Sequence, residues 1–321
     1  MIDHKNYFSL PDMAMRILIV GAGAVGGYFG GRLAHAGRDV TFLVRPSRAK
    51  QLRQDGLRII SPHGDAVLTP KLISATEIDT PYDLVFLSVK AYALQAAMND
   101  LAAAIGPETM ILPVLNGMRH VDLLSRRFGE NPVIGGVCLV ATEIDDKGRI
   151  VQLADMQQLL YGERNGETTP RLKSLDTTLQ GAGFHARLST DIMQAMWEKW
   201  VQLASLGAIT CLMRGTIGEI VAVPGGAELS LKVVDESAAV ATACGHKPSE
   251  AILSRHAAAM TAPGSPLTSS MYRDLRKGAP VEVDHILGDF IERGSEHGAA
   301  TPLLKAAFVN LSVYQGRLQK P

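Results

Sequence analysis

The sequence has no net charge that would indicate a charged macromolecular partner. Its 321 residues include 32 Lys and Arg against 32 Asp and Glu. Because no excess of positive charge is present, nothing in the composition favours binding to nucleic acid or to an anionic membrane. We therefore expect a small-molecule partner, with no nucleic acid and no membrane.

Cysteine is also scarce. Cys138, Cys211 and Cys244 lie far apart in the sequence and form no CxxC pair, and at least one of the three must stay unpaired within the chain. No His/Cys pair has the spacing of metal ligands, so no metal site is expected. The pattern fits a reducing, cytoplasmic setting.

Long apolar runs and targeting signals are missing as well. The first residues, MIDHKNYFSLPDMAMR, scatter charge among apolar positions and contain Pro11, unlike the apolar core of a signal peptide. Uncharged apolar stretches such as residues 200–213 are shorter than the roughly 18 residues that span a bilayer. We expect residues 1–14 to be a loose N-terminal extension.

What the chain does contain is enough apolar material for large cores. Hydrophobic residues make up 46% and charged residues 20%, which is typical of a globular protein. At about 150 residues per domain, the length favours two domains.

The first half alternates strands and helices. RILIV, the turn GAGAVGG, a helix ending at Gly37 and the strand DVTFLV form a βαβ unit, and such all-apolar strands are typical of a buried parallel sheet. Residues 57–60 and 66–73 predict a small hairpin. Further elements are expected downstream: strands at 83–89, 109–115 and 132–141, an alanine-rich helix at 92–105, and an antiparallel extension at 149–155 and 156–162.

The second half changes character. From Asp191 onward, four or five helical stretches are separated by Gly and Pro, and strand signals are almost absent. The predicted fold is α/β, with an N-terminal Rossmann dinucleotide-binding domain at 15–189 and an all-helical C-terminal domain at 190–321. A homodimer is left open, because no heptad pattern marks an interface.

A glycine motif, Gly21-x-Gly23-x-x-Gly26, lies between a predicted strand and a predicted helix. In that setting the first glycine allows the tight turn, the second the approach of a pyrophosphate, and the third close packing of helix on strand. A plain strand-to-helix turn is the alternative. The context favours a dinucleotide site.

The end of the second strand favours NADP over NAD. An NAD enzyme usually has an acidic residue there to bind the ribose 2′-hydroxyl, but this chain has Val-Arg-Pro-Ser-Arg. The guanidinium groups of Arg45 and Arg48 suit a 2′-phosphate. Surface arginines without a ligand are the alternative.

Two polar groups follow other predicted strands. Lys90 comes after DLVFLSV and Asn116-Gly117 after TMILPVL. Ligands of such sheets bind beyond the carboxyl ends of the strands, so both side chains are candidates to contact cofactor or substrate. A helix-start lysine and an ordinary Asn-Gly turn are the alternatives.

In the helical half, one lysine interrupts an apolar stripe. Lys199 shares the stripe with Ile192, Met196, Leu203 and Leu206. Such a lysine would be partly desolvated and prepared to give up a proton, or it would extend to solvent from a buried helix. The Ser and acidic residues at 268–274 and 281–284 are equally consistent with ordinary helix starts.

The combined motifs resemble the ketopantoate reductase family (2-dehydropantoate 2-reductases). The matching segments are GAGAVGG at 21–27, SVK at 88–90, LNGM at 115–118, WEK at 197–199, SSM through Asp274 at 269–274, and EVD at 282–284. The resemblance implies reduction of 2-dehydropantoate to (R)-pantoate with NADPH, a step toward pantothenate and coenzyme A, in a cleft between the two domains.

The resemblance also assigns roles. Lys199 looks like the general acid, Glu282 like the carboxylate that orients it and the substrate hydroxyl, and Ser270 and Asn116 like substrate-binding residues. The implied cofactor contacts are Gly21, Gly23, Ala24, Val25, Gly26, Arg45, Lys90, Asn116 and Glu282.

One departure from the family matters. Well-known members have asparagines four and eight residues after the lysine, whereas this chain has Leu203 and Gly207. The first hypothesis is therefore a ketopantoate reductase acting on its small 2-keto acid, and the second a related reductase or dehydrogenase of another 2-oxo or 3-hydroxy acid. A third is a dinucleotide-binding protein without catalysis, against which the presence of both Lys199 and Glu282 argues.

Overall fold

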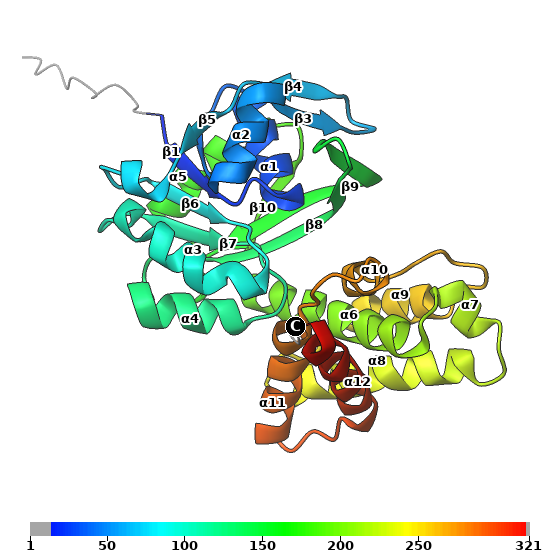
Figure 1. Cartoon of the computed structure of the whole chain (residues 1–321). Helices are drawn as coiled ribbons and strands as arrows, with labels where there is room; N and C mark the ends of the chain where they lie inside the picture. Colours follow the sequence, from blue (N-terminus) through cyan, green and yellow to red (C-terminus); the bar gives the residue numbers. More distant parts are fainter. Residues whose placement is uncertain (1–13, 319–321) are drawn as a thin grey trace, which may run out of the picture.

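The computed structural model describes residues 14–318. Apart from residue 14, the predicted N-terminal extension lies outside the described residues. An upper part made of two sheets and their helices lies on a lower part made of helices alone (Figure 1). The α/β fold class with a helical C-terminal part is confirmed.

The first sheet has five parallel strands in the order β5-β2-β1-β6-β7. Their bounds are Lys71–Ile73, Asp39–Leu43, Arg16–Val20, Leu84–Leu87 and Met110–Pro113. Strands β6 and β7 are buried along their whole length, as their apolar sequences predict. The order reverses between β1 and β6, and ligands of such sheets bind beyond the strand ends at this point.

Four helices accompany this sheet: α1 (Ala24–His35), α2 (Pro46–Asp55), α3 (Leu94–Asp100) and α4 (Arg119–Phe128). The predicted alanine-rich helix at 92–105 is interrupted. Three-residue 3₁₀ turns at Ala91–Ala93 and Ala102–Ala104 flank α3, so only the middle is α-helical.

The second sheet has the order β10-β9-β3-β4, and β8 pairs with β9. The strands are β3 (Leu57–Ile60), β4 (Ala66–Leu68), β8 (Gly135–Ile144), β9 (Ile150–Gly162) and β10 (His185–Leu188). The predicted antiparallel extension is a single long strand, β9, paired antiparallel with β8.

The predicted hairpin is only half right. Strands β3 and β4 pair antiparallel, but the last part of the predicted second arm forms β5, which pairs parallel with β2 in the first sheet. Pro70, between β4 and β5, cannot donate to a ladder, and the chain changes sheets there.

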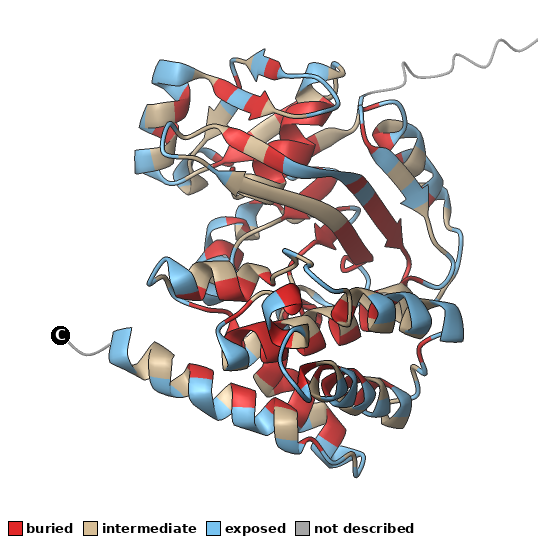
Figure 2. Cartoon of the chain, turned by 90° about the vertical axis from the view of Figure 1, so that its right-hand side faces the viewer, coloured by how far each residue is buried: buried red, intermediate tan, exposed pale blue. Residues whose placement is uncertain are grey.

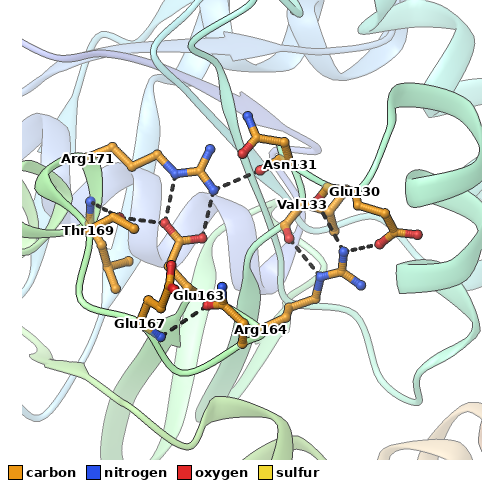
Figure 3. A network of polar contacts seen from close by, with 10 residues as sticks. Glu130, Asn131, Val133, Glu163, Arg164, Glu167, Thr169 and Arg171 are labelled. Carbon is orange, nitrogen blue, oxygen red and sulfur yellow. Dashed lines mark hydrogen bonds and ion pairs between the residues drawn. The ribbon is translucent and has the colours of Figure 1, made fainter.

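A partly buried ion pair fixes the end of β9 (Figure 3). The Arg171 guanidinium, in α5 (Pro170–Leu179), donates to both carboxylate oxygens of Glu163 at 2.8 and 2.7 Å. Burial alone would raise the pKa of Glu163, but hydrogen bonds from Arg171 and Thr169 outweigh it and lower the pKa. Arg164 binds the carbonyls of Glu130 and Val133, which ties this corner to the segment before β8.

The helical part is built around α6 (Ile192–Met213). It is buried on most sides, as its apolar sequence predicts, and is surrounded by α7 (Ile217–Val221), α8 (Gly226–Ala243), α9 (Glu250–Met260), α10 (Ser270–Arg276), α11 (Asp289–Glu296) and α12 (Pro302–Leu318). A π-helical turn, Asp284–Gly288, precedes α11. Among residues 14–318, no helix has both the length and the apolar character needed to cross a membrane.

Of two hydrophobic cores among the described residues, one runs through both parts. The same cluster of buried side chains includes Leu18 of β1 and Trp200 of α6. Figure 2 shows the buried residues in red along strands and inner helix faces, with exposed residues outside. We keep the domain boundary near residue 189 as a proposal; it falls between β10 and α6.

Candidate active site

The glycine motif forms the turn from β1 into α1. Gly21 has a φ of +98°, which glycine adopts without strain, and Gly23 is the residue before the helix. A Cβ on Gly26 would lie 2.2 Å from the Gly21 carbonyl oxygen, whereas a Cβ on Gly23 would meet no atom within 4 Å. Gly26 therefore allows close packing, and Gly23 faces open space at a helix N-terminus, which suits a pyrophosphate.

The two arginines after β2 differ. Arg45 is exposed and precedes α2, and its guanidinium makes no hydrogen bond or ion pair with any described residue. Arg48 is half-buried and donates to the Ala22 carbonyl at 3.1 Å and the Gly148 carbonyl at 3.1 Å, while its second terminal nitrogen has no partner. A guanidinium with a spare donor thus lies against the glycine turn, so the residues present fit a dinucleotide.

The Asn-Gly turn follows β7 and meets the helical part. Gly117 has a φ of +81°, and a Cβ there would lie 2.4 Å from the His285 carbonyl oxygen in the π-helical turn. The Asn116 side chain is half-buried and makes no hydrogen bond within residues 14–318. Its amide is thus available to a ligand.

Lys90 joins the two parts of the molecule. Its Nζ lies 2.8 Å from the Asp274 carboxylate in α10 and 3.6 Å from that of Glu282. Burial lowers the pKa of Lys90, but the charges of Glu282 and Asp274 outweigh it and raise the pKa. Glu282 is itself buried and accepts the Ala91 backbone N–H at 2.9 Å.

Lys199 lies on α6, half-buried, and shares a small pocket with Gly117, Trp200 and Leu203. Its Nζ is 3.9 Å from the Cys138 sulfur in β8. Within the described residues no hydrogen bond or ion pair links Lys199 to Glu282. The orienting role that the resemblance implies for Glu282 thus stays a prediction, and Glu282 contacts Lys90 and Ala91 instead.

Two adjacent serines at the start of α10 differ in their hydrogen bonding. Ser269 is the N-cap, and its Oγ accepts the Tyr272 N–H at 3.0 Å. The half-buried Ser270 hydroxyl has no hydrogen-bond partner among the described residues. The ordinary capping interpretation therefore applies to Ser269 and leaves Ser270 available to a substrate.

The positions of the missing asparagines are apolar. Leu203 lines the pocket with Lys199. At Gly207, a Cβ would lie 2.8 Å from the terminal methyl of Met271, so the Met271 side chain occupies this side of the helix. Polar recognition of a substrate from these two positions is absent.

Sequence reasoning missed Cys138, which contacts Lys199, and the buried His120. Cys138 had no assigned role, because its contact with Lys199 depends on how β8 packs against α6. His120 is fully buried and neither ring nitrogen has a partner among residues 14–318. Burial, together with the positive charges of His285, Lys199 and Arg293, lowers the pKa of His120 to about 3. His120 is therefore neutral at pH 7.

Two family profiles cover most of the chain. The profile for "Ketopantoate reductase PanE/ApbA" matches residues 17–166, and that for "Ketopantoate reductase PanE/ApbA C terminal" matches residues 191–315. The chain belongs to the ketopantoate reductase family. Members are oxidoreductases that reduce a 2-oxo acid with a pyridine nucleotide, and the family prediction from the sequence is confirmed.

Individual relatives are similar over nearly their full length. A Bacillus subtilis (strain 168) protein, the uncharacterized oxidoreductase YkpB, is 36% identical over 301 residues, covering 94% of this chain and 99% of its own. The crystal structure of 2-dehydropantoate 2-reductase from Geobacter metallireducens GS-15 is 27% identical, with a TM-score of 0.85 and coverage of 93% and 99%.

A third similarity concerns the fold alone. The ternary structure of D-mandelate dehydrogenase with NADH and anilino(oxo)acetate has a TM-score of 0.85 at 21% identity, covering 95% of this chain and 100% of that one. The family fold is thus shared by proteins whose named substrates differ.

Proposed function

We propose that this protein uses NADPH to reduce a small 2-oxo acid to the corresponding 2-hydroxy acid. The observation that carries the proposal is the position of Lys199, half-buried beside the Asn-Gly turn that follows a strand of the nucleotide-binding sheet. The first candidate substrate is 2-dehydropantoate, the substrate named for the Geobacter relative. A role in pantothenate synthesis and a cytoplasmic location stay predictions.

The cofactor would be held by the glycine turn and the arginines after β2. Backbone N–H groups at Gly23, Ala24 and Val25 suit the pyrophosphate, and Arg45 with the spare donor of Arg48 suits a 2′-phosphate. When bound, the cofactor supplies the hydride. The preference for NADPH over NADH rests on these arginines and on the lack of an acidic residue after β2.

Lys199 acts as the general acid. Addition of a hydride to a carbonyl carbon develops negative charge on the oxygen, which an ammonium group stabilises and then protonates. Asn116 and Ser270 have uncommitted polar groups and are proposed to bind the substrate. Glu282 is proposed to bind the substrate hydroxyl and to orient Lys199 when substrate is present.

The second candidate is a different small 2-oxo acid. The observation in its favour is the pair Leu203 and Gly207, with Met271 packed against the latter, because these positions offer a substrate no polar group.

The test follows NADPH absorbance with 2-dehydropantoate and a panel of other 2-oxo acids. We expect oxidation of NADPH with at least one of them. If none is reduced, the reductase proposal is wrong; if others are reduced and 2-dehydropantoate is not, the first candidate is excluded.

A further inference from the structure

A second, larger cavity lies beside Lys199, between the second sheet and helices α6 and α9. Its volume is about 520 Å³. Cavities of roughly 300–1,000 Å³ typically enclose ligands of drug size, so this one exceeds the needs of a small 2-oxo acid. Figure 1 shows β8 and β9 above α6 and α9.

The sheet side of the cavity presents one row of side chains. In the strand register Val137 pairs with Leu160, and Leu160 pairs with Arg187. Paired residues on neighbouring strands point to the same face, so all three line this wall. The Arg187 side chain is exposed and makes no hydrogen bond or ion pair with any residue from 14 to 318.

The helix side presents polar groups from two helices. Lys199 and Gln202 come from α6, and Arg255 and His256 from α9. Arg255 is exposed, and only its Nε is engaged, donating to the Ala251 carbonyl of its own helix at 3.3 Å. The terminal nitrogens of both arginines are therefore available to a ligand.

The charge of the cavity lining is positive. Arg187, Arg255 and Lys199 contribute three positive groups against one carboxylate, Glu198. Oε1 of that carboxylate already accepts the Ser249 backbone N–H at 3.0 Å and the Gln194 amide at 3.3 Å.

His256 does not change this balance at neutral pH. Its Nε2 lies 2.6 Å from the Ser205 hydroxyl, and burial lowers the pKa of His256 to about 4. The ring is therefore neutral, and the lining keeps its excess of positive charge.

We propose that this cavity receives the end of the substrate that lies away from the reacting carbonyl, and that this end is a carboxylate bound by Arg187 and Arg255. Planar guanidinium groups suit a carboxylate in a bidentate arrangement. The substrate class is thus a 2-oxo acid with a second carboxylate. The inference rests on the proposed 2-oxo acid reduction and favours its second candidate.

The neighbouring face of α6 supports the same conclusion. Leu203 and Gly207 offer no polar group to a substrate, and Met271 packs against Gly207. Arg187 and Arg255 line the cavity that Lys199 also lines, and their terminal nitrogens are free. Substrate specificity then depends on Arg187 and Arg255 rather than on positions 203 and 207.

The experiment compares kcat/KM with NADPH for 2-oxoglutarate and 2-oxoadipate against 2-oxopentanoate and 2-oxohexanoate, their matched monocarboxylates, and against 2-dehydropantoate. We expect the diacids to be preferred by about tenfold or more, as one charge-assisted hydrogen-bonded pair allows. The ratio of diacid to monoacid should fall about tenfold in Arg187→Gln and in Arg255→Gln, and less in Arg187→Lys. Arg126→Gln, an exposed arginine of α4 outside the cavity, is the control and should keep the ratio.

A second measurement detects substrate binding without catalysis. Calorimetry of 2-oxoglutarate binding to the protein with NADP⁺ should show the same loss in Arg187→Gln. Reduction of monoacids with equal or greater efficiency, unaffected by the arginine variants, overturns the inference and leaves the reductase intact. If no 2-oxo acid is reduced, the reductase proposal fails, and the inference fails with it.

Discussion

At the scale of single residues, the site depends on groups left without a partner inside the protein. Asn116 and Ser270 have free polar side chains, and the Lys199 ammonium contacts only a sulfur atom among the hydrogen-bonding groups described. Lys90 is the opposite case, since Asp274 and Glu282 already bind it. We expect Lys90 to act mainly by holding Glu282 in place.

Replacing Lys199 tests the general-acid role. Lys199→Ala should lower kcat by roughly 10²–10⁴, because proton transfer from a positioned acid contributes about that much. The Kd for NADPH, measured by fluorescence titration, should change far less. Lys305→Ala, at an exposed position of α12, is the control. A near-normal kcat in Lys199→Ala would show that another group delivers the proton.

Reversing one charge after β2 tests the cofactor preference. Arg45→Glu should weaken NADPH binding by about 30-fold or more, since a charge-assisted hydrogen bond is lost and a repulsion added. NADH binding should change little. Arg53→Glu, in the last turn of the same helix, is the matched control. Equal effects on both cofactors contradict the 2′-phosphate assignment.

At the scale of elements, the turn from β1 to α1 contains one glycine needed for packing and another that leaves space for a ligand. Gly26 packs so closely that a side chain would strike the Gly21 carbonyl, whereas Gly23 faces open space. The two glycines belong to one motif, but we expect different consequences when each is replaced.

The variants Gly23→Ala and Gly26→Ala distinguish the packing role from the cofactor-binding role. Gly23→Ala should keep the unfolding midpoint within roughly 2 °C yet weaken NADPH binding by about tenfold or more, because its methyl fills the space for the pyrophosphate. Gly26→Ala should lose about 2 kcal/mol of stability through overpacking. Calorimetry and fluorescence titration check both. Unchanged cofactor affinity in Gly23→Ala argues against the motif as the nucleotide site.

The local elements are those that the sequence predicts best. The strand, glycine turn and helix from Arg16 to His35 follow from neighbouring residues, and so does the buried α6. The chain's change of sheet after β4 does not, because β5 pairs with β2, about 30 residues earlier in the sequence. Cys138 and His120 were also missed, since the contact of Cys138 with Lys199 and the burial of His120 arise only when distant elements pack.

At the scale of the whole molecule, the two parts are joined by a shared core and by ion pairs. Arg293 of α11 binds Asp122 of α4, and Lys277 binds Glu143 of β8 at 3.1 Å. The Trp200 indole donates to the Ile286 carbonyl at 2.9 Å, and its Nε1 would lie 3.7 Å from a Cβ on Gly117 of the Asn-Gly turn. The shared core therefore lies next to the proposed active site where the two parts of the molecule join.

The buried histidines make overall stability depend on pH. Histidine titrates near 6.5 in an unfolded chain, but burial lowers the pKa of His120 to about 3 and of His256 to about 4. Below about pH 6.5 the unfolded state therefore binds more protons, and stability falls as pH decreases. Each group contributes at most about 1.4 kcal/mol per pH unit.

Denaturant unfolding between pH 7.5 and pH 5.0 measures this dependence. His120→Leu should reduce the loss of stability over that range, whereas His35→Leu, on the exposed side of α1, should not. The same loss in His120→Leu as in the unmodified protein would mean that His120 is protonated in the folded state as readily as in the unfolded one.

Hydride transfer from NADPH to a 2-oxo acid can be followed by isotope transfer. NADPH carrying deuterium at both C4 positions of the nicotinamide is oxidised with the best 2-oxo acid, and the product is analysed by NMR. We expect a 2-hydroxy acid with one deuterium at C2 for each NADPH consumed. A product without deuterium at C2, or no product with any 2-oxo acid, would contradict the proposed hydride transfer.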